Sequence, residues 1–299
     1  MNMPCFNIAA VERDTGLSKD VLRMWERRYG FPAPLRDAHG ERLYPAEQVD
    51  RLRLIKRLMD QGHRPGKLFA LPPEALAELG PRRPRLAEMQ PGADHGDLEE
   101  LVGLIRQNDS AGYRQAMHQR LARQGLLHFV QDTVAPLTRR IGEAWEQGEI
   151  EVFEEHLFTE LTKRLLRQAI ASLPAGDGPR ILLTSLPEEQ HVLGLLMVEA
   201  LFALEGADCI PLGTQMPLLE IGRAVEAHRA DIVALSFSVA FPTRQIAPLL
   251  RQLRQLVPAS VEIWVGGEGI RRVEVPAGIL PLGDLPAAVA ALDDRRRAA

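Results

Sequence analysis

Residues 180–206 read RILLTSLPEEQHVLGLLMVEALFALEG, and this stretch decides the fold class of the carboxy-terminal part of the chain. The run RILLTS has the continuous apolar pattern of a buried strand, and an apolar helical stretch follows it. Glu189, His191 and Gly194 lie between the two with the spacing Glu-x-His-x-x-Gly. In open parallel sheets ligands bind at the carboxyl ends of strands, where this strand-to-helix junction falls. We therefore expect a ligand site around His191.

His191 has the properties of a metal ligand. Imidazole is a good ligand for a borderline metal such as cobalt, and a carboxylate two residues earlier can hold the other ring nitrogen and fix the tautomer. Gly194 would leave space for a bulky group beside the helix. A single histidine at such a place can also be an ordinary surface residue, and the three-residue motif alone leaves both interpretations open.

Further strands downstream predict that this junction belongs to a parallel sheet. Strand-like runs alternate with helical stretches, which is typical of an α/β, Rossmann-like sheet wrapped by helices. The later runs are DCIPL (208–212), DIVALSFS (231–238) and VEIWVGG (261–267), and the helical stretches lie at about 190–205, 217–229 and 243–256. One run ends in Ser236 and Ser238 and the last in Gly266 and Gly267, so hydroxyls and backbone without side chains converge at one sheet edge.

A helical segment precedes the sheet. From 98 to 172 apolar residues recur at spacings of three and four, which predicts a small helical bundle. The recurring residues are Val130, Val134, Leu137, Ile141, Trp145, Phe153, Leu157, Leu161 and Leu165. Trp145 offers a broad apolar face to a ligand, and Glu155 and His156 offer hydrogen bonds. Trp145 can also be a plain core residue, because it lies on the same apolar stripe.

The first 30 residues have the outline of a helix-turn-helix. Asn7 can cap a short helix, Thr15 and Gly16 supply a turn, and Ser18 can cap a second helix that runs through Arg28. The basic residues on this second helix are Lys19, Arg23, Arg27 and Arg28. Such side chains can neutralise phosphates and reach guanine edges, or they form only a solvated helix face.

The next stretch, LRDAHGERLY (35–44), predicts two short strands around Asp37 to Gly40 that form a wing, and a further helix follows at about 46–61. The wing residues that are candidates for contact with DNA are Arg36, His39, Arg42 and Tyr44. Residues 1–70 hold 13 Lys and Arg against 9 Asp and Glu, a net charge of +4. Because the whole chain has a net charge of −4, the remainder carries −8. We therefore expect the N-terminal 70 residues to bind nucleic acid.

Composition limits the class of protein. A chain of 299 residues with 45% hydrophobic and 25% charged residues is expected to be globular, with two or three domains. We find no membrane-spanning run and no signal peptide, so we expect a cytoplasmic protein without a membrane partner. Cys5 and Cys209 are too far apart in the chain to indicate a disulfide framework or a zinc site. No nucleophile or general-base pair stands out, which predicts a protein that is not an enzyme.

The segment LSKDVLRMWERRYGFPAPLRDAHGERLYPAEQVDRLRLIKRLMDQGH (17–63) resembles the winged-helix domain of MerR-family regulators, over about the first 70 residues. The resemblance implies a transcriptional regulator that binds operator double-stranded DNA. In MerR relatives a long terminal helix usually pairs two subunits. Here residues 80–97, GPRRPRLAEMQPGADHGD, have the composition of a linker, so we expect the later domains to pair the subunits.

The order Glu189-x-His191-x-x-Gly194, then Ser236 and Ser238, then Gly266 and Gly267, resembles the cobalamin-binding domain shared by methionine synthase, mutases and corrinoid proteins. That domain shows Asp-x-His-x-x-Gly, a strand end with Ser, and Gly-Gly. The resemblance implies that His191 ligates cobalt from below in place of the benzimidazole of the cofactor, whose freed tail passes the Ser and Gly positions. Glu189 stands where Asp is commonest, and its longer side chain should still reach the ring.

Trp145, nine residues, then Glu155-His156 matches the Trp-x9-Glu-His pattern of the cobalamin-dependent CarH and LitR photoreceptor regulators, in which the bundle covers the upper face of the cofactor. The resemblance spans nearly the whole chain. It implies a winged helix at 1–79, a linker at 80–97, a helical-bundle cap at 98–174 and a cobalamin-binding domain at 178–299.

The same resemblance implies a repressor that forms a homo-oligomer, a dimer or a tetramer, with adenosylcobalamin; methylcobalamin is a second candidate. Light would cleave the cobalt-carbon bond, separate the oligomer and release the DNA. One residue departs from the pattern: the best-known photoreceptors have a His after the capping Trp, which can take the upper cobalt position after light, and this chain has Glu146. His156 or water can substitute, or the protein responds to cobalamin occupancy instead of light.

Two rival functions stay open at this point. A corrinoid methyl carrier would share the bundle and His191, although it has no reason to carry a winged helix. A regulator that senses by protein contact alone, with a vestigial cobalamin fold, would keep the DNA-binding part and make no use of His191.

Overall fold

The computed structural model describes the chain except residues 1–4, 38, 61–62, 73–74, 77–93 and 299. The chain divides into two compact units, Met1–Gln90 and Pro91–Ala299. Residues 80–93 of the expected linker lie outside the described residues, and the first helix after them begins at Asp94. No helix in the described ranges combines the length and the apolar character needed to cross a bilayer.

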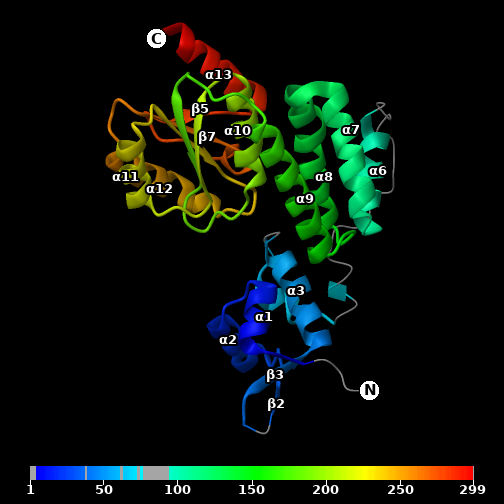
Figure 1. The fold of residues 1–299 in the computed structure, drawn as a ribbon. Coiled ribbons are helices and arrows are strands. Elements are labelled where there is room, and N and C mark those ends of the chain that lie inside the picture. The colour runs from blue at the N-terminus through cyan, green and yellow to red at the C-terminus, as the bar shows by residue number, and fades with distance from the viewer. Residues whose placement is uncertain (1–4, 38, 61–62, 73–74, 77–93, 299) are drawn as a thin grey trace. The chain divides into compact units, whose positions relative to one another are not determined.

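The N-terminal unit is a helix-turn-helix with a small antiparallel wing, as the sequence predicts (Figure 1). Its elements are β1 (Cys5–Asn7), α1 (Ile8–Thr15), α2 (Lys19–Tyr29), β2 (Leu35–Arg36), β3 (Arg42–Pro45), α3 (Ala46–Asp60) and α4 (Pro65–Leu68). The wing has the strand order β1-β3-β2, so β3 pairs on both sides. The sequence analysis missed β1, because three residues that are all exposed carry no alternating pattern.

The helix ends follow from local chemistry. The Asn7 side chain accepts a hydrogen bond from the backbone N of Ala10, and the Ser18 side chain accepts one from the backbone N of Val21. Gly16 ends α1 with a φ of 69°, a left-handed conformation that glycine adopts without steric cost. Trp25 of α2 is 2% exposed and packs edge-on against Phe69. The predicted caps and turn are thus confirmed, and the apolar face of α2 forms the core.

The second unit begins with a helical bundle. Its elements are α6 (Asp94–Arg106), α7 (Ser110–His128), the π-helical turn η1 (Phe129–Val134), α8 (Ala135–Glu146) and α9 (Val152–Ala171). Val130, Val134 and Leu137 are fully buried, as their spacing predicts. Phe153, in the first turn of α9, is 59% exposed, although the same pattern assigns it to the bundle.

A five-stranded parallel sheet completes the second unit, with the order β5-β4-β6-β7-β8. Its elements are β4 (Arg180–Thr184), α10 (Leu193–Leu204), β5 (Asp208–Gly213), α11 (Leu218–His228), β6 (Ile232–Ser236), α12 (Thr243–Leu256), β7 (Glu262–Gly266), the 3-10 turn η2 (Glu268–Ile270), β8 (Leu280–Pro281) and α13 (Leu285–Ala298). Helices α10 and α13 cover one face of the sheet and α11 and α12 the other (Figure 1), and each face has its own cluster of buried side chains. The Rossmann-like prediction is confirmed.

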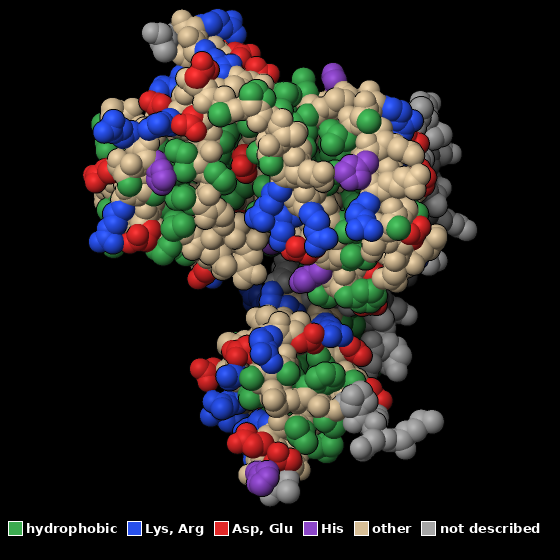
Figure 2. Space-filling view, viewed as in Figure 1, with side chains coloured by type: hydrophobic (Ala, Val, Ile, Leu, Met, Phe, Trp, Pro, Cys, Tyr) green, Lys and Arg blue, Asp and Glu red, His purple; other side chains and the backbone are tan. Residues whose placement is uncertain are grey.

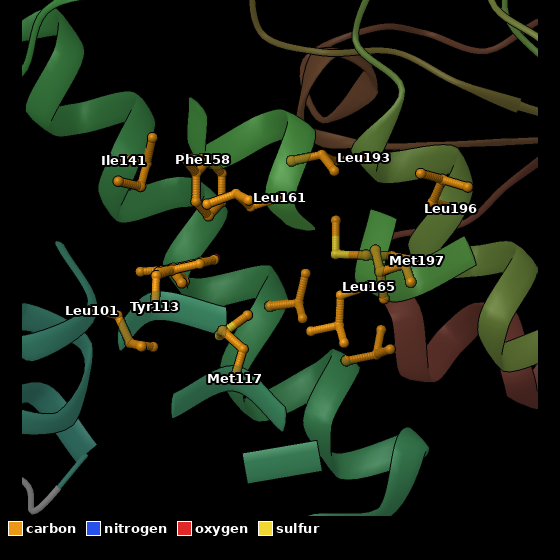
Figure 3. Close-up of a cluster of buried hydrophobic side chains, with 14 of the residues drawn as sticks. Leu101, Tyr113, Met117, Ile141, Phe158, Leu161, Leu165, Leu193, Leu196 and Met197 are labelled. Atoms are coloured by element: carbon orange, nitrogen blue, oxygen red, sulfur yellow. The ribbon is translucent and has the colours of Figure 1, made fainter. Parts of the chain in front are cut away.

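Helix α10 is buried on two sides, and it joins the sheet to the bundle. Leu195 and Phe202 belong to the core between α10 and the sheet. Leu193, Leu196 and Met197 point toward Leu161 and Leu165 of α9 and belong to the core of the bundle (Figure 3). A helix that is apolar all round is stable only when both sides are covered. The bundle and the sheet therefore share one helix within a single compact unit.

We predict that Leu201→Ala destabilises the Pro91–Ala299 unit by about 2 to 5 kcal/mol, the usual cost of removing a fully buried leucine. Urea denaturation of the full chain, followed by circular dichroism, measures this cost. The matched control is Leu204→Ala on the same helix, which should cost less than about 1 kcal/mol because Leu204 is 39% exposed. Equal losses in the two variants would contradict a two-sided α10.

Candidate functional site

Ser185 organises the loop that follows β4. Its hydroxyl donates to the backbone O of Glu189 at 2.8 Å and accepts from the backbone N of Gln215 at 3.0 Å. Its backbone O accepts from the N of Met216, so the loops after β4 and β5 are fixed to each other. The sequence analysis missed Ser185; the signal that could have revealed it is a serine directly after a buried strand, at the carboxyl edge of the sheet.

Glu189 is the buried centre of this edge. Its side chain is 1% exposed, and its carboxylate accepts four hydrogen bonds. Two come from His191, from Nδ1 at 2.8 Å and from the backbone N at 2.9 Å. The other two come from Ser238, from the backbone N at 2.7 Å and from Oγ at 2.9 Å. The predicted contact between Glu189 and the imidazole is therefore present, and the carboxylate also holds the loop after β6.

The contact between Glu189 and His191 shifts the pKa values of both side chains. Burial acts to raise the pKa of Glu189, but the hydrogen bonds from His191 and Ser238 outweigh it and hold that pKa below its ordinary value. The hydrogen bond to Glu189 raises the pKa of His191, against the opposing effect of burial. Glu155 at the start of α9 raises the pKa of His191 as well, so this part of the bundle lies within electrostatic reach of the imidazole.

The imidazole has one nitrogen left for a ligand. Because Nδ1 is engaged by Glu189, the neutral ring carries its free lone pair on Nε2. The side chain of His191 is 60% exposed. This combination of a fixed tautomer and an accessible second nitrogen is the arrangement that a metal-binding histidine requires.

Glycines allow the elements around His191 to approach closely. A Cβ on Gly194 would lie 2.5 Å from Oγ of Ser236, and one on Gly267 would lie 2.3 Å from the backbone O of Phe237. Gly267 also has a φ of 96°, which side chains rarely tolerate. At Gly266 a Cβ would make only ordinary contacts, so space does not require glycine there. Gly269, which the sequence analysis missed, would bring a Cβ to 2.3 Å from the backbone O of Ser238.

The three candidate residues of the bundle lie at the end of α8 and the start of α9. Trp145 is half-buried and packs against the bundle core. The carboxylate of Glu155 accepts from Oγ1 of Thr159 and contacts Nδ1 of His156, both at 2.8 Å. The side chain of His156 is 73% exposed. Of the three, Glu155 is the one whose charge acts on His191.

These residues fit a large metal-bearing cofactor. The site offers one free imidazole nitrogen, and the missing side chains of Gly194 and Gly267 let Ser236 and Phe237 approach closely beside it. Exposed apolar side chains lie on the loops and helix starts nearby: Phe153 at 59%, Leu219 at 63% and Val239 at 70%. Exposed large apolar side chains suit contact with a broad, partly apolar ligand.

Of the candidate DNA-contacting residues of α2, Lys19 is partly exposed and Arg23, Arg27 and Arg28 are exposed. Figure 2 shows Lys and Arg side chains at the surface of the N-terminal unit. Lys19 is paired with Glu12 at 3.5 Å and Arg23 with Asp20 at 3.6 Å. Arg27 donates from Nε to the backbone O of Arg23. Arg28, also exposed, has its guanidinium over the ring of Tyr29 at 5.3 Å.

The wing residues differ in exposure. Arg36 and His39 are exposed, and Arg36 donates to the backbone O of Gly40 at 2.7 Å. Arg42 is paired with Glu26 of α2 at 2.9 Å, a residue that the sequence analysis did not consider. The pKa of Arg42 is raised, chiefly by this hydrogen bond.

The position of Tyr44 contradicts the expectation that this residue contacts DNA. Its side chain is 0% exposed and belongs to the core of the N-terminal unit, so it does not present a hydroxyl to DNA. Successive residues of a strand point to opposite faces, and Tyr44 takes the inner face of β3. Among the described residues its hydroxyl has no hydrogen-bond partner.

Comparison with known proteins agrees with this architecture. Residues 6–68 match the family model "MerR HTH family regulatory protein", and residues 97–170 match the model "B12 binding domain". The solved structure of a monomethylamine corrinoid protein from Methanosarcina barkeri is similar in fold, with a TM-score of 0.52 at 16% identity. The similarity covers 67% of this chain and 99% of that one.

Two curated relatives span nearly the whole chain. The HTH-type transcriptional repressor CarH of Myxococcus xanthus is 30% identical over 267 residues, which are 89% of either protein. The repressor CarA of the same organism is 32% identical over 271 residues, 88% of this chain and 87% of that protein. The chain therefore belongs to the MerR family of helix-turn-helix transcriptional regulators, in the group that joins the winged helix to a B12-binding domain.

Proposed function

We propose that this chain is a cobalamin-dependent transcriptional repressor, in which the winged helix binds operator DNA and the second unit senses cobalamin. The observation that carries the proposal is the imidazole of His191, held by a buried carboxylate through Nδ1 and free at Nε2. A single oriented imidazole suits a metal that arrives inside an organic ring, since the ring supplies most of the other ligands.

Cobalamin supplies a cobalt ion within a corrin ring and, in the adenosyl form, a cobalt-carbon bond that light can break. In this proposal Nε2 of His191 would hold the cobalt, and Glu189 holds the imidazole in position through Nδ1. The tail of the cofactor would pass the sheet edge that carries Ser236, Ser238, Gly266 and Gly267, with Gly194 opposite on α10. The observation that favours this use is that these residues lie at the carboxyl edge of the sheet beside His191, where Ser238 donates hydrogen bonds to Glu189.

We assign the upper face of the cobalamin to the helical bundle. Trp145 offers an apolar surface, and Glu155 and His156 offer polar groups that can hydrogen-bond an upper axial group. An adenosyl group suits these residues better than a methyl group, because a methyl group makes no hydrogen bonds. We therefore favour adenosylcobalamin as the cofactor.

Oligomerisation would couple cobalamin to DNA. Two winged helices held together bind DNA about 10² to 10⁴ times more tightly than one, provided that both reach their sites. In this proposal the cofactor-loaded second unit forms a dimer or tetramer that presents paired winged helices, and loss of the upper ligand separates it. We assign no enzymatic reaction to the chain, because the relatives that span it are transcriptional repressors.

For DNA binding, we predict that Arg27→Gln weakens operator binding and reduces the slope of log affinity against log salt by about 1, the effect of one lost phosphate contact. Tyr44→Phe should leave operator affinity unchanged, because the Tyr44 hydroxyl is buried. The operator is first selected from a random duplex pool, and Arg106→Gln, in α6, serves as the charge-matched control. A loss in Tyr44→Phe, or none in Arg27→Gln relative to Arg106→Gln, would contradict these assignments.

For cobalamin binding, we predict that Glu189→Gln lowers affinity about 10- to 100-fold, the usual effect of removing a partner that orients a metal-binding histidine. His191→Ala should leave any bound cobalamin with its own lower base attached, which its ultraviolet-visible spectrum reports. His228→Ala, at the end of α11, is the control and should bind as the unaltered chain does. If His191→Ala retains the spectrum of the unaltered holoprotein, His191 is not the lower ligand.

For light sensing, we predict that the full chain with adenosylcobalamin is a larger oligomer in darkness and a smaller one after illumination, with weaker operator binding. Light scattering coupled to gel filtration, beside operator titration, measures both. Glu146 after Trp145 favours a variant of this function in which cobalamin occupancy alone is sensed. If oligomer size and operator affinity depend on cobalamin but not on light, the protein senses cobalamin occupancy alone. If neither quantity depends on cobalamin or on light, the proposed switch is overturned.

A further inference from the structure

An open groove of about 700 Å³ lies between α12 and the segment that follows η2, in the second unit. Arg244 and Arg251 of α12 and Arg272 of the following segment line it. Helix α12 packs on the opposite face of the sheet from α10, which contacts the bundle, so the groove is separate from the shared core around α10. It has no part in the function proposed above.

The three arginines of the groove are exposed, and in the described part of the chain none is in an ion pair or hydrogen bond. Neighbouring arginines in the same two segments have structural partners. Arg254 of α12 donates to the backbone O atoms of Val257, Pro258 and Val261. Arg271, beside Arg272, is paired with Glu268 at 2.9 Å. The fold thus uses Arg254 and Arg271 and leaves the groove arginines available to an external anion.

Charge and spacing indicate a ligand with several negative charges. Glu274 is the one acidic residue that lines the groove, so three guanidinium groups leave an excess of two positive charges. Arg244 and Arg251 are seven residues apart on α12, which places them on one side of the helix about 10 Å apart along its axis. Guanidinium groups spread over this length suit two or more linked phosphates better than a single ion. The planar guanidinium also matches phosphate with paired hydrogen bonds.

Apolar side chains form part of the groove wall, between its charged residues. Val273, Val275 and Pro276 lie on the segment that also carries Arg272 and Glu274, and Ala247 adds a small side chain from α12. A concave site of several hundred Å³ with an apolar wall and a few charged groups is typical of small organic ligands. A surface for the DNA backbone needs positive charge but no hollow lined by apolar side chains.

From these observations we infer that the groove between α12 and residues 272–277 binds a phosphorylated organic ligand of the nucleoside di- or triphosphate class. The arginines bind the phosphates, and the apolar wall contacts the organic part. Glu274 can accept hydrogen bonds from amino or hydroxyl groups of the ligand.

The test is isothermal titration of the full chain with adenosine triphosphate, guanosine triphosphate and inorganic tripolyphosphate, in parallel. At least one nucleotide should bind, and more tightly than tripolyphosphate, because only the nucleotide reaches the apolar wall. Arg251→Gln and Arg272→Gln should each weaken nucleotide binding about tenfold or more, the effect of losing one charge-assisted hydrogen bond. Arg271→Gln removes the same charge from the adjacent position and should bind nucleotide as the unaltered chain does.

Three outcomes would overturn the inference. The first is that neither nucleotide binds. The second is that tripolyphosphate and the nucleotides bind with equal affinity. The third is that Arg271→Gln weakens nucleotide binding as much as Arg251→Gln and Arg272→Gln do. Titration of the same variants with a random-sequence duplex identifies the alternative occupant. If Arg251→Gln and Arg272→Gln reduce the salt slope of duplex binding while neither nucleotide binds, the groove is a DNA contact. Because these substitutions leave the winged helix and His191 intact, the result is independent of the cobalamin-dependent repressor function.

Discussion

The carboxylate of Glu189 is the constraint on which the sensing unit depends. A buried charge costs several kcal/mol unless it is paired and hydrogen-bonded, and this one receives four hydrogen bonds from His191 and Ser238. The loops after β4 and β6 must therefore adopt their conformations together. As a result the fold itself sets the orientation of the imidazole. A longer acid in place of aspartate reaches both loops, so Glu189 does more than orient a histidine.

Helix α10 connects the loop that holds Glu189 and His191 to the bundle. It begins two residues after His191, and its side chains are buried against both α9 and the sheet. Close-packed interiors transmit displacement because they cannot compress. A displacement of the imidazole would therefore disturb the packing of α10 against α9, whose first turn carries Glu155. The same buried helix explains why the bundle and the sheet form one compact unit, although their sequence patterns change abruptly at the break at 174–179.

The sequence predicts those features that depend on local chemistry. Caps at Asn7 and Ser18, the four longer strands, and the contact between Glu189 and His191 all follow from spacing within a few residues. Features that depend on tertiary packing were missed. Tyr44 was assigned to the surface because alternation in a four-residue strand does not reveal which face is covered. Strand β8 has two exposed residues, and the alanine-rich α13 has little apolar periodicity, so neither gave a signal.

The ion pairs of the N-terminal unit indicate which basic residues could most easily exchange a carboxylate partner for a DNA phosphate. Lys19 and Arg23 have exposed partners in Glu12 and Asp20, and such pairs contribute only about 0 to 1 kcal/mol, so a phosphate can replace the carboxylate at little cost. Arg42 and Glu26 are less exposed, at 28% and 26%, and are joined at 2.9 Å across the wing and α2. Breaking that pair would leave a partly buried carboxylate without its partner. Arg42 is therefore better suited to fix the wing against α2, and the exposed Arg27 and Arg28 are the stronger candidates for a phosphate contact.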